Sequence, residues 1–265
     1  MTNTKFRKRM LLSSVAMLLV ALVALGSATF AWFTSSTTAT ASGINVQTVQ
    51  ASDLQISKSD FTWGTSVNYA TTATFEPASS INGVNWFSGE GTSRTDGTQK
   101  SGQDWVALTS ANKGGYVFED MLNVRNNGKA AVNNVTITFN FNETPATNGK
   151  NYLRIAVVPL TATTDSAAGS ETPTAANFQA NVYAADTTAY NGVSAVDTAS
   201  TQITPKATYS INVGNLAGKT DSVTAAKYYK LFVWFEGQDA DCQDQYAGNS
   251  LPSISFQVTG TTAQS

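Results

Sequence analysis

Apolar and polar residues alternate along much of the chain, a pattern that predicts β-strands. The alternation is unbroken over residues 135–142, so one face of that strand is expected to be buried and the other wet. Residues 117–124 predict the strand before it, and residues 228–235, apolar on both faces, predict a central strand. Four further alternating runs are marked by Leu153, Ile155 and Val157, by Phe178, Ala180 and Val182, by Tyr209, Ile211 and Val213, and by Ile254, Phe256 and Val258.

Turn-forming residues separate these strands, as in the Arg-Asn-Asn-Gly-Lys stretch at 125–129. No segment after residue 34 shows a helical period longer than two turns. The pattern therefore predicts an all-β sandwich over residues 51–265. Two polar stretches near 58–112 and 161–206 interrupt the rhythm, and we expect both to be long loop insertions on the surface.

Composition narrows the chemistry that such a fold can carry. The chain has 37 threonines, no histidine and a single cysteine, and only 13% of its residues are charged. Without histidine there is no Ser-His-Asp or Cys-His nucleophile pair and no HExxH zinc site. One cysteine cannot form an internal disulfide or a CxxC metal knuckle. Threonine, which is β-branched, suits a pleated and half-exposed surface.

The N-terminus has the three-part layout of a secretory signal peptide, which we expect to be a helix spanning residues 1–31. Four basic residues lie between Lys5 and Arg9, an apolar run follows from 10 to 26, and small residues then surround a cleavage point after Ala31. The alternative is an uncleaved membrane anchor over residues 10–33. Cleavage would leave 12 basic and 18 acidic residues, a net charge of −6, which argues against nucleic acid as a partner.

Four short motifs, in this order, carry a resemblance to a known family. They are the junction Thr29-Phe30-Ala31-Trp32-Phe33-Thr34, the segment Ala41-Ser42-Gly43-Ile44-Asn45-Val46, residues 118–135 (FEDMLNVRNNGKAAVNNV), and Tyr246-Ala247-Gly248-Asn249-Ser250 with Ile254 and Phe256. Together they resemble the TasA- and camelysin-like secreted proteins of Gram-positive bacteria. The first motif is similar to the junction, with Thr29, Ala31 and Trp32, that is cut by a dedicated SipW-type signal peptidase.

The resemblance implies an extracellular protein with a jelly-roll-like antiparallel β-sandwich. Its relatives assemble into fibres of the biofilm matrix or decorate the cell surface, so homo-oligomerisation and an extracellular or cell-surface location are expected. Some members carry a metallopeptidase label, which the absence of histidine argues against, since a zinc site made of carboxylates alone is rare. A carboxylate-based enzyme would need a pair such as Glu119 and Asp120. As neighbours in a strand, however, these point to opposite faces.

The segment at 32–50 is the candidate for assembly. Trp32 and Phe33 would form the new N-terminus, followed by a Thr/Ser run and then by Ile44 and Val46. Such a segment can add as a donor strand to an open sheet edge of the next copy, and head-to-tail use of that contact makes a filament. The alternatives are a flexible leader, or a segment that folds back as the first strand of its own chain.

Two further groups of residues are candidate ligand sites. The acidic loop at 236–244 offers Asp239, Asp241 and Asp244 as oxygen ligands for Ca²⁺, although the spacing does not match an EF-hand and a solvated loop is the simpler interpretation. Cys242, in that loop, is expected to be buried or to form an occasional intermolecular bridge.

The aromatic residues of the first insertion, Trp63, Trp86 and Trp105, could form a flat platform for sugars, or could anchor the insertion to the core. We therefore expect a non-enzymatic structural protein, a subunit of extracellular fibres that needs no cofactor. The alternative is a monomeric surface adhesin or carbohydrate-binding protein.

Overall fold

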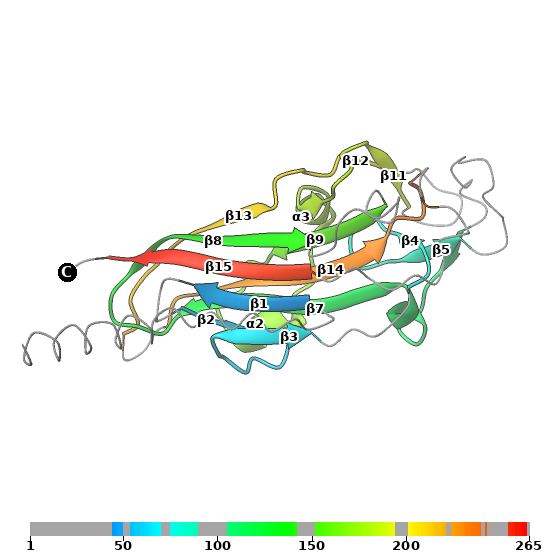
Figure 1. Ribbon diagram of the computed structural model, residues 1–265. Helices are drawn as coiled ribbons and strands as arrows, with labels where there is room; N and C mark the ends of the chain where they lie inside the picture. The colour runs from blue at the N-terminus through cyan, green and yellow to red at the C-terminus, as the bar shows by residue number, and fades with distance from the viewer. Residues whose placement is uncertain are drawn as a thin grey trace, which may run out of the picture. The chain divides into compact units, whose positions relative to one another are not determined.

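The computed structural model describes residues 44–49, 54–69, 75–89, 105–141, 152–193, 201–220, 224–239, 242 and 254–263, all of which belong to one compact unit, Ala41–Ser265. Within these ranges the chain forms mostly antiparallel β-sheets, and two five-stranded sheets face each other (Figure 1). The all-β sandwich expected from the alternation is therefore confirmed. The predicted signal helix lies outside the described residues.

The first sheet, sheet 1, contains both the first and the last of the described strands. Its order is β13 (Ser210–Leu216), β8 (Val132–Phe141), β15 (Ile254–Thr262), β1 (Ile44–Val49) and β3 (Ser66–Tyr69). Strand β1 runs parallel to β15 and antiparallel to β3, whereas β8 is antiparallel to both of its neighbours. None of these five strands contains an Asp, Glu, Lys or Arg residue.

The second sheet, sheet 2, is more apolar and carries the charges. Its order is β10 (Val182–Tyr183), β9 (Leu153–Pro159), β14 (Ala226–Phe235), β7 (Val117–Asn126) and β2 (Leu54–Ser57). Strand β14 is the predicted central strand, and it pairs with β7 on one side and β9 on the other. It is apolar on both faces because a core lies on each side of it.

The main core fills the space between the two sheets. Alternate residues point into it, for example Ile137 and Phe139 of β8, Leu231 and Val233 of β14, and Phe256 of β15, each 2% exposed or less. At about 25 cal/mol per Å² of buried apolar surface, this two-sided burial is the dominant favourable contribution to folding. Cys242 is 3% exposed and belongs to the same core, which is the first of its two expected roles.

A third layer covers the outer face of sheet 2, and most of it comes from the segments that we expected to be surface loops. A second apolar cluster joins this layer to the sheet, with Trp86 and Phe178 packed on Phe232 and Trp234. The insertions are thus not loops alone, since these parts form short strands and helices that pack on sheet 2. The elements of the layer are β4 (Ala78–Ser79), β5 (Phe87–Gly89), β6 (Trp105–Ala107), η2 (Lys113–Gly115), α2 (Asp165–Ser170), α3 (Ala175–Gln179), β11 (Tyr190–Gly192) and β12 (Thr201–Ile203).

One strand prediction also fails in this layer. Phe178 and Ala180 were expected to alternate along a strand with Val182, but Phe178 lies in helix α3 and only Val182 is in a strand, β10. Thr174 caps the helix, since its Oγ1 accepts a hydrogen bond from the Asn177 N–H at 3.2 Å. A helix of five residues is too short to show a 3.6-residue period, so the sequence pattern could not distinguish it from a strand.

Candidate functional site

Only part of the candidate assembly segment at 32–50 lies within the described residues. Trp32 and Phe33, like the cleavage residues Thr29 and Ala31, lie outside the described residues. Ile44 and Val46, in contrast, lie in β1, where Ile44 is opposite Ile254 on one side and Tyr69 on the other. Since both edges of β1 are paired within the chain, we correct the donor-strand assignment of Ile44 and Val46. For these two residues the fold-back alternative holds.

The aromatic platform considered for Trp63, Trp86 and Trp105 is not formed by Trp86 and Trp105. Trp86 and Trp105 are each 1% exposed, so neither ring is available to a sugar. The alternative, that these residues anchor the insertion to the core, holds for both. Trp63 differs, because it remains partly exposed and lies in a surface pocket.

This pocket, which we call the Arg125 pocket, has a volume of about 530 Å³. Arg125 lies under the indole of Trp63, with its Cζ atom 4.4 Å from the ring centroid. Asp165 accepts a hydrogen bond on each carboxylate oxygen, from Trp63 Nε1 at 3.3 Å and from the Tyr228 hydroxyl at 2.7 Å. The lining residues are Trp63, Arg125, Thr163, Thr164, Asp165, Thr224, Ala226 and Tyr228.

Burial changes the acid–base properties of this pocket. It lowers the pKa of Arg125 from its ordinary value, while the nearby Asp165 carboxylate acts in the opposite direction. Burial, together with the hydrogen bond to Asp165, raises the pKa of the Tyr228 hydroxyl well above its usual range. Tyr228 therefore stays protonated and remains a hydrogen-bond donor to Asp165. The sequence analysis missed Arg125, Asp165 and Tyr228, and no local pattern marks them, since β7 also contains the charged residues Glu119 and Asp120.

The first of the three candidate calcium ligands in the acidic loop, Asp239, is not available to a metal ion. Asp239 is 7% exposed and forms an ion pair with Arg154 of β9, whose side chain is fully buried. The guanidinium of Arg154 also lies over the ring of Tyr190, 5.3 Å from its centroid. Asp241 and Asp244 lie outside the described residues, so the calcium hypothesis keeps only those two candidates. Within the described ranges, no cluster of acidic and cysteine side chains could hold a metal ion.

Glu236 lies beside this ion pair and is fully buried. Its carboxylate accepts hydrogen bonds from Trp234 Nε1 and from the Gln238 N–H, each at 3.0 Å. Burial nevertheless dominates and raises the pKa of Glu236 from 4.5 to about 7, with these hydrogen bonds, that of Ser79, and the charge of Arg154 opposing it. The buried Tyr190 hydroxyl also faces this carboxyl group, and its own pKa is raised by burial.

The raised pKa of Glu236 predicts a pH-dependent stability. Between about pH 4.5 and 7 the folded chain holds a proton that the unfolded chain releases, so the free energy of unfolding falls as the pH rises and levels off above pH 7. The full contribution is on the order of 3 kcal/mol. We expect Glu236→Gln to remove this part of the slope in urea denaturation curves recorded across that range. An identical slope in the variant and the parent would show that Glu236 does not cause it.

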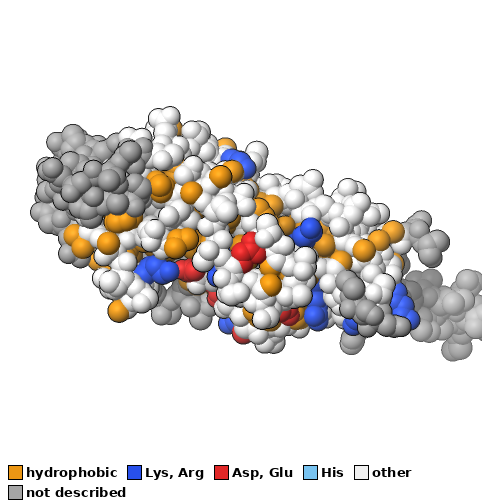
Figure 2. All heavy atoms as spheres, turned by 180° about the vertical axis from the view of Figure 1, so that it is seen from behind, with side chains coloured by type: hydrophobic (Ala, Val, Ile, Leu, Met, Phe, Trp, Pro, Cys, Tyr) orange, Lys and Arg blue, Asp and Glu red, His pale blue; other side chains and the backbone are white. Residues whose placement is uncertain are grey.

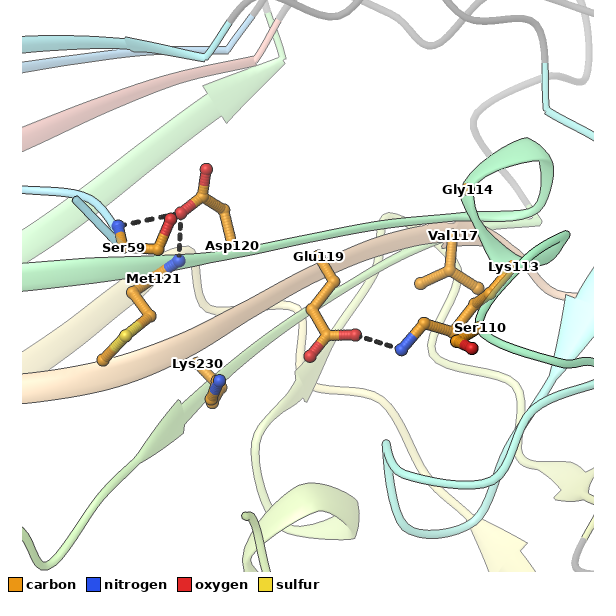
Figure 3. A pocket seen from close by; sticks show the side chains of 9 residues that line it. All are labelled: Ser59, Ser110, Lys113, Gly114, Val117, Glu119, Asp120, Met121 and Lys230. Atoms are coloured by element: carbon orange, nitrogen blue, oxygen red, sulfur yellow. Dashed lines mark hydrogen bonds and ion pairs between the residues drawn. The ribbon is translucent and has the colours of Figure 1, made fainter. Parts of the chain in front are cut away.

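A second surface pocket, of about 390 Å³, contains the carboxylate pair considered for an enzyme. Figure 3 shows that Glu119 and Asp120 point in opposite directions, as expected for neighbours in a strand. Glu119 forms an ion pair with Lys113, and Asp120 Oδ1 accepts from the Ser59 N–H at 3.0 Å and the Met121 N–H at 2.7 Å. Each carboxylate thus has its own partners, and this arrangement does not bring the two together on one reacting group.

Two further findings concern membrane spans and similarity to known proteins. Among the described residues, no helix is both long and apolar enough to cross a membrane. No protein-family model matches the chain, and no curated protein or solved structure is significantly similar to it.

Proposed function

We propose that the chain is a secreted structural subunit of extracellular fibres, in which the segment at 32–43 of one copy pairs with sheet 1 of the next. The observation that supports this proposal best is the absence of charge from all five strands of sheet 1. Exposed sheet surfaces of soluble proteins normally carry charged side chains, which prevent sheets from associating. A charge-free sheet is suited to contact with another copy.

The outward-facing side chains of sheet 1 extend this argument. Across β13, β8 and β15, Ser210, Thr138 and Gln257 occupy one row. The next row contains Asn212, Thr136 and Thr259. Such uncharged hydroxyl and amide groups make no electrostatic barrier to a neighbouring polypeptide and can form hydrogen bonds to it.

Sheet 1 has two edge strands, β13 and β3, and we propose β13 as the one at which addition occurs. No described residue pairs with the side of β13 that faces away from β8. A bulge near Gly214 interrupts its register, but the part at 210–212 pairs regularly with β8 and has a free edge. The segment at 32–43 is also uncharged, and it leads directly into β1 of the same sheet. An incoming strand of this kind would gain a row of backbone hydrogen bonds.

Deletion of residues 32–42 from the secreted protein is expected to abolish filaments in negative-stain electron microscopy. N-terminal sequencing of the parent material, with Trp32 expected as the first residue, establishes the processing in the same sample. Undiminished filaments from the shortened protein would contradict strand addition by this segment.

A pair of point substitutions tests the edge itself. Ser210→Lys places a charge on the open edge, whereas Gln257→Lys places the same charge at the centre of the same face, on a strand that is paired on both sides. We expect only Ser210→Lys to reduce the number and length of filaments. If only Gln257→Lys reduced the filaments, the contact between copies would lie on the face of sheet 1 and not at its edge.

A further inference from the structure

The Arg125 pocket has no part in the proposed fibre contact. It lies on the outer face of sheet 2, where the end of β7 meets the start of β14, with Arg125 opposite Ala226. Its volume of about 530 Å³ falls within the range of pockets that bind small molecules. The pocket combines one cation, two aromatic rings and three threonines, and this combination requires an explanation of its own.

The guanidinium of Arg125 is held in one position by two contacts. Its Nε atom donates a hydrogen bond to Gln55 Oε1 at 2.8 Å, and its Cζ atom lies over the Trp63 ring, 4.4 Å from the ring centroid. Neither contact uses the two terminal Nη nitrogen atoms. None of the ion pairs formed by the described residues includes Arg125. The fork of N–H groups that matches a carboxylate is therefore already oriented.

The one acidic residue of the pocket, Asp165, is hydrogen-bonded to two other residues of its lining. Asp165 receives the Trp63 indole N–H on one oxygen and the Tyr228 hydroxyl on the other. It therefore fixes the two aromatic side chains that border Arg125. The result is a rigid cation between oriented rings, with the side chains of Thr163, Thr164 and Thr224 around it.

We propose that this pocket binds an acidic saccharide through the carboxylate of a uronic acid residue. Arg125 would bind the carboxylate with two parallel hydrogen bonds, the threonine hydroxyls would bond to sugar hydroxyls, and the partly exposed ring of Trp63 would contact the apolar face of the sugar. General electrostatic attraction does not account for such binding, because the chain has a formal net charge of −2 and would repel a polyanion. This proposal is independent of the fibre role.

The test compares two oligosaccharides of equal length, oligogalacturonate and a neutral maltooligosaccharide, by isothermal titration calorimetry with the full chain. We expect binding of oligogalacturonate only, weakened about tenfold or more by Arg125→Gln, since charge-assisted hydrogen bonds to a carboxylate are lost. Arg125→Lys, which keeps the charge but loses the fork, is expected to fall between the parent and Arg125→Gln.

Lys230→Gln is the matched control. Lys230 lies on the same two-strand unit, opposite Met121, and lines the other surface pocket. This substitution removes an equal charge and should leave the affinity unchanged. Equal binding of the neutral oligosaccharide, unchanged affinity in a folded Arg125→Gln variant, or an equal loss in Lys230→Gln would each overturn the proposal. A sugar phosphate that binds where oligogalacturonate does not would also overturn it.

Discussion

Replacing Asp239 with alanine is expected to destabilise the folded chain by about 3–5 kcal/mol, because Arg154 would be left as a buried charge without its carboxylate. The Arg154 side chain has no exposed surface and Asp239 is 7% exposed, so water cannot replace the lost partner. The measurement is equilibrium unfolding in urea, which gives the free energy of unfolding of each variant. A loss below about 1 kcal/mol would place this pair among ordinary surface ion pairs.

A double-mutant cycle separates the ion pair from the loss of packing. The variants are Asp239→Ala, Arg154→Met and the two combined, and methionine keeps most of the length of the arginine side chain. We expect the combined variant to be more stable than Asp239→Ala, since an apolar side chain at 154 no longer requires a buried counter-charge. If the two losses simply add, the pair contributes no coupling and the cause lies elsewhere in this loop.

Substitution of Trp86 by alanine is expected to cost about 3–5 kcal/mol, the range for removal of a large aromatic core residue. Trp86 is 1% exposed, and its ring centroid lies 5.1 Å from that of Trp234 and 5.9 Å from that of Phe232, both on β14. Its Nε1 also donates to the Gly83 carbonyl at 3.1 Å. The substitution would therefore leave a cavity between the third layer and sheet 2.

The control for this substitution is Trp63→Ala. Trp63 belongs to the same insertion but is partly exposed, and we expect a loss of no more than about 1–2 kcal/mol there. Thermal unfolding monitored by circular dichroism measures both variants. Equal losses would mean that the Trp86 ring contributes no more than the partly exposed Trp63, contrary to its role as the anchor of the insertion.

The strands of the main core could be predicted from the sequence, whereas the elements that form the third layer could not. Residues 135–139 alternate because a strand with one buried face has a period of two, and β8 confirms it. Phe178 gave a false strand signal, because the five residues of helix α3 are too few to show a helical period, and Trp86 lies just before the short strand β5 and shows no period at all. Their burial depends on contact with Phe232 and Trp234, which lie on a strand distant in sequence.

The candidate sites divide in the same way. Trp63, Trp86 and Trp105 share one local context, a polar insertion, so the sequence could not tell which ring would remain exposed. The pairing of Arg125 with Trp63, or of Arg154 with Asp239, joins residues 62 and 85 positions apart, and no local pattern records such a pair. Only the register between strands brings them together.

The sequence by itself determined the all-β class, the central strand at 228–235 and the exclusion of histidine chemistry, because each depends on residue type or on near neighbours. The tertiary structure decided that β1 pairs within its own sheet, that two of the three tryptophans are buried, and that Arg125 faces a pocket. These outcomes depend on which strands pair and on which face of sheet 2 the third layer covers. That is a property of packing between distant segments, which the order of residues does not display.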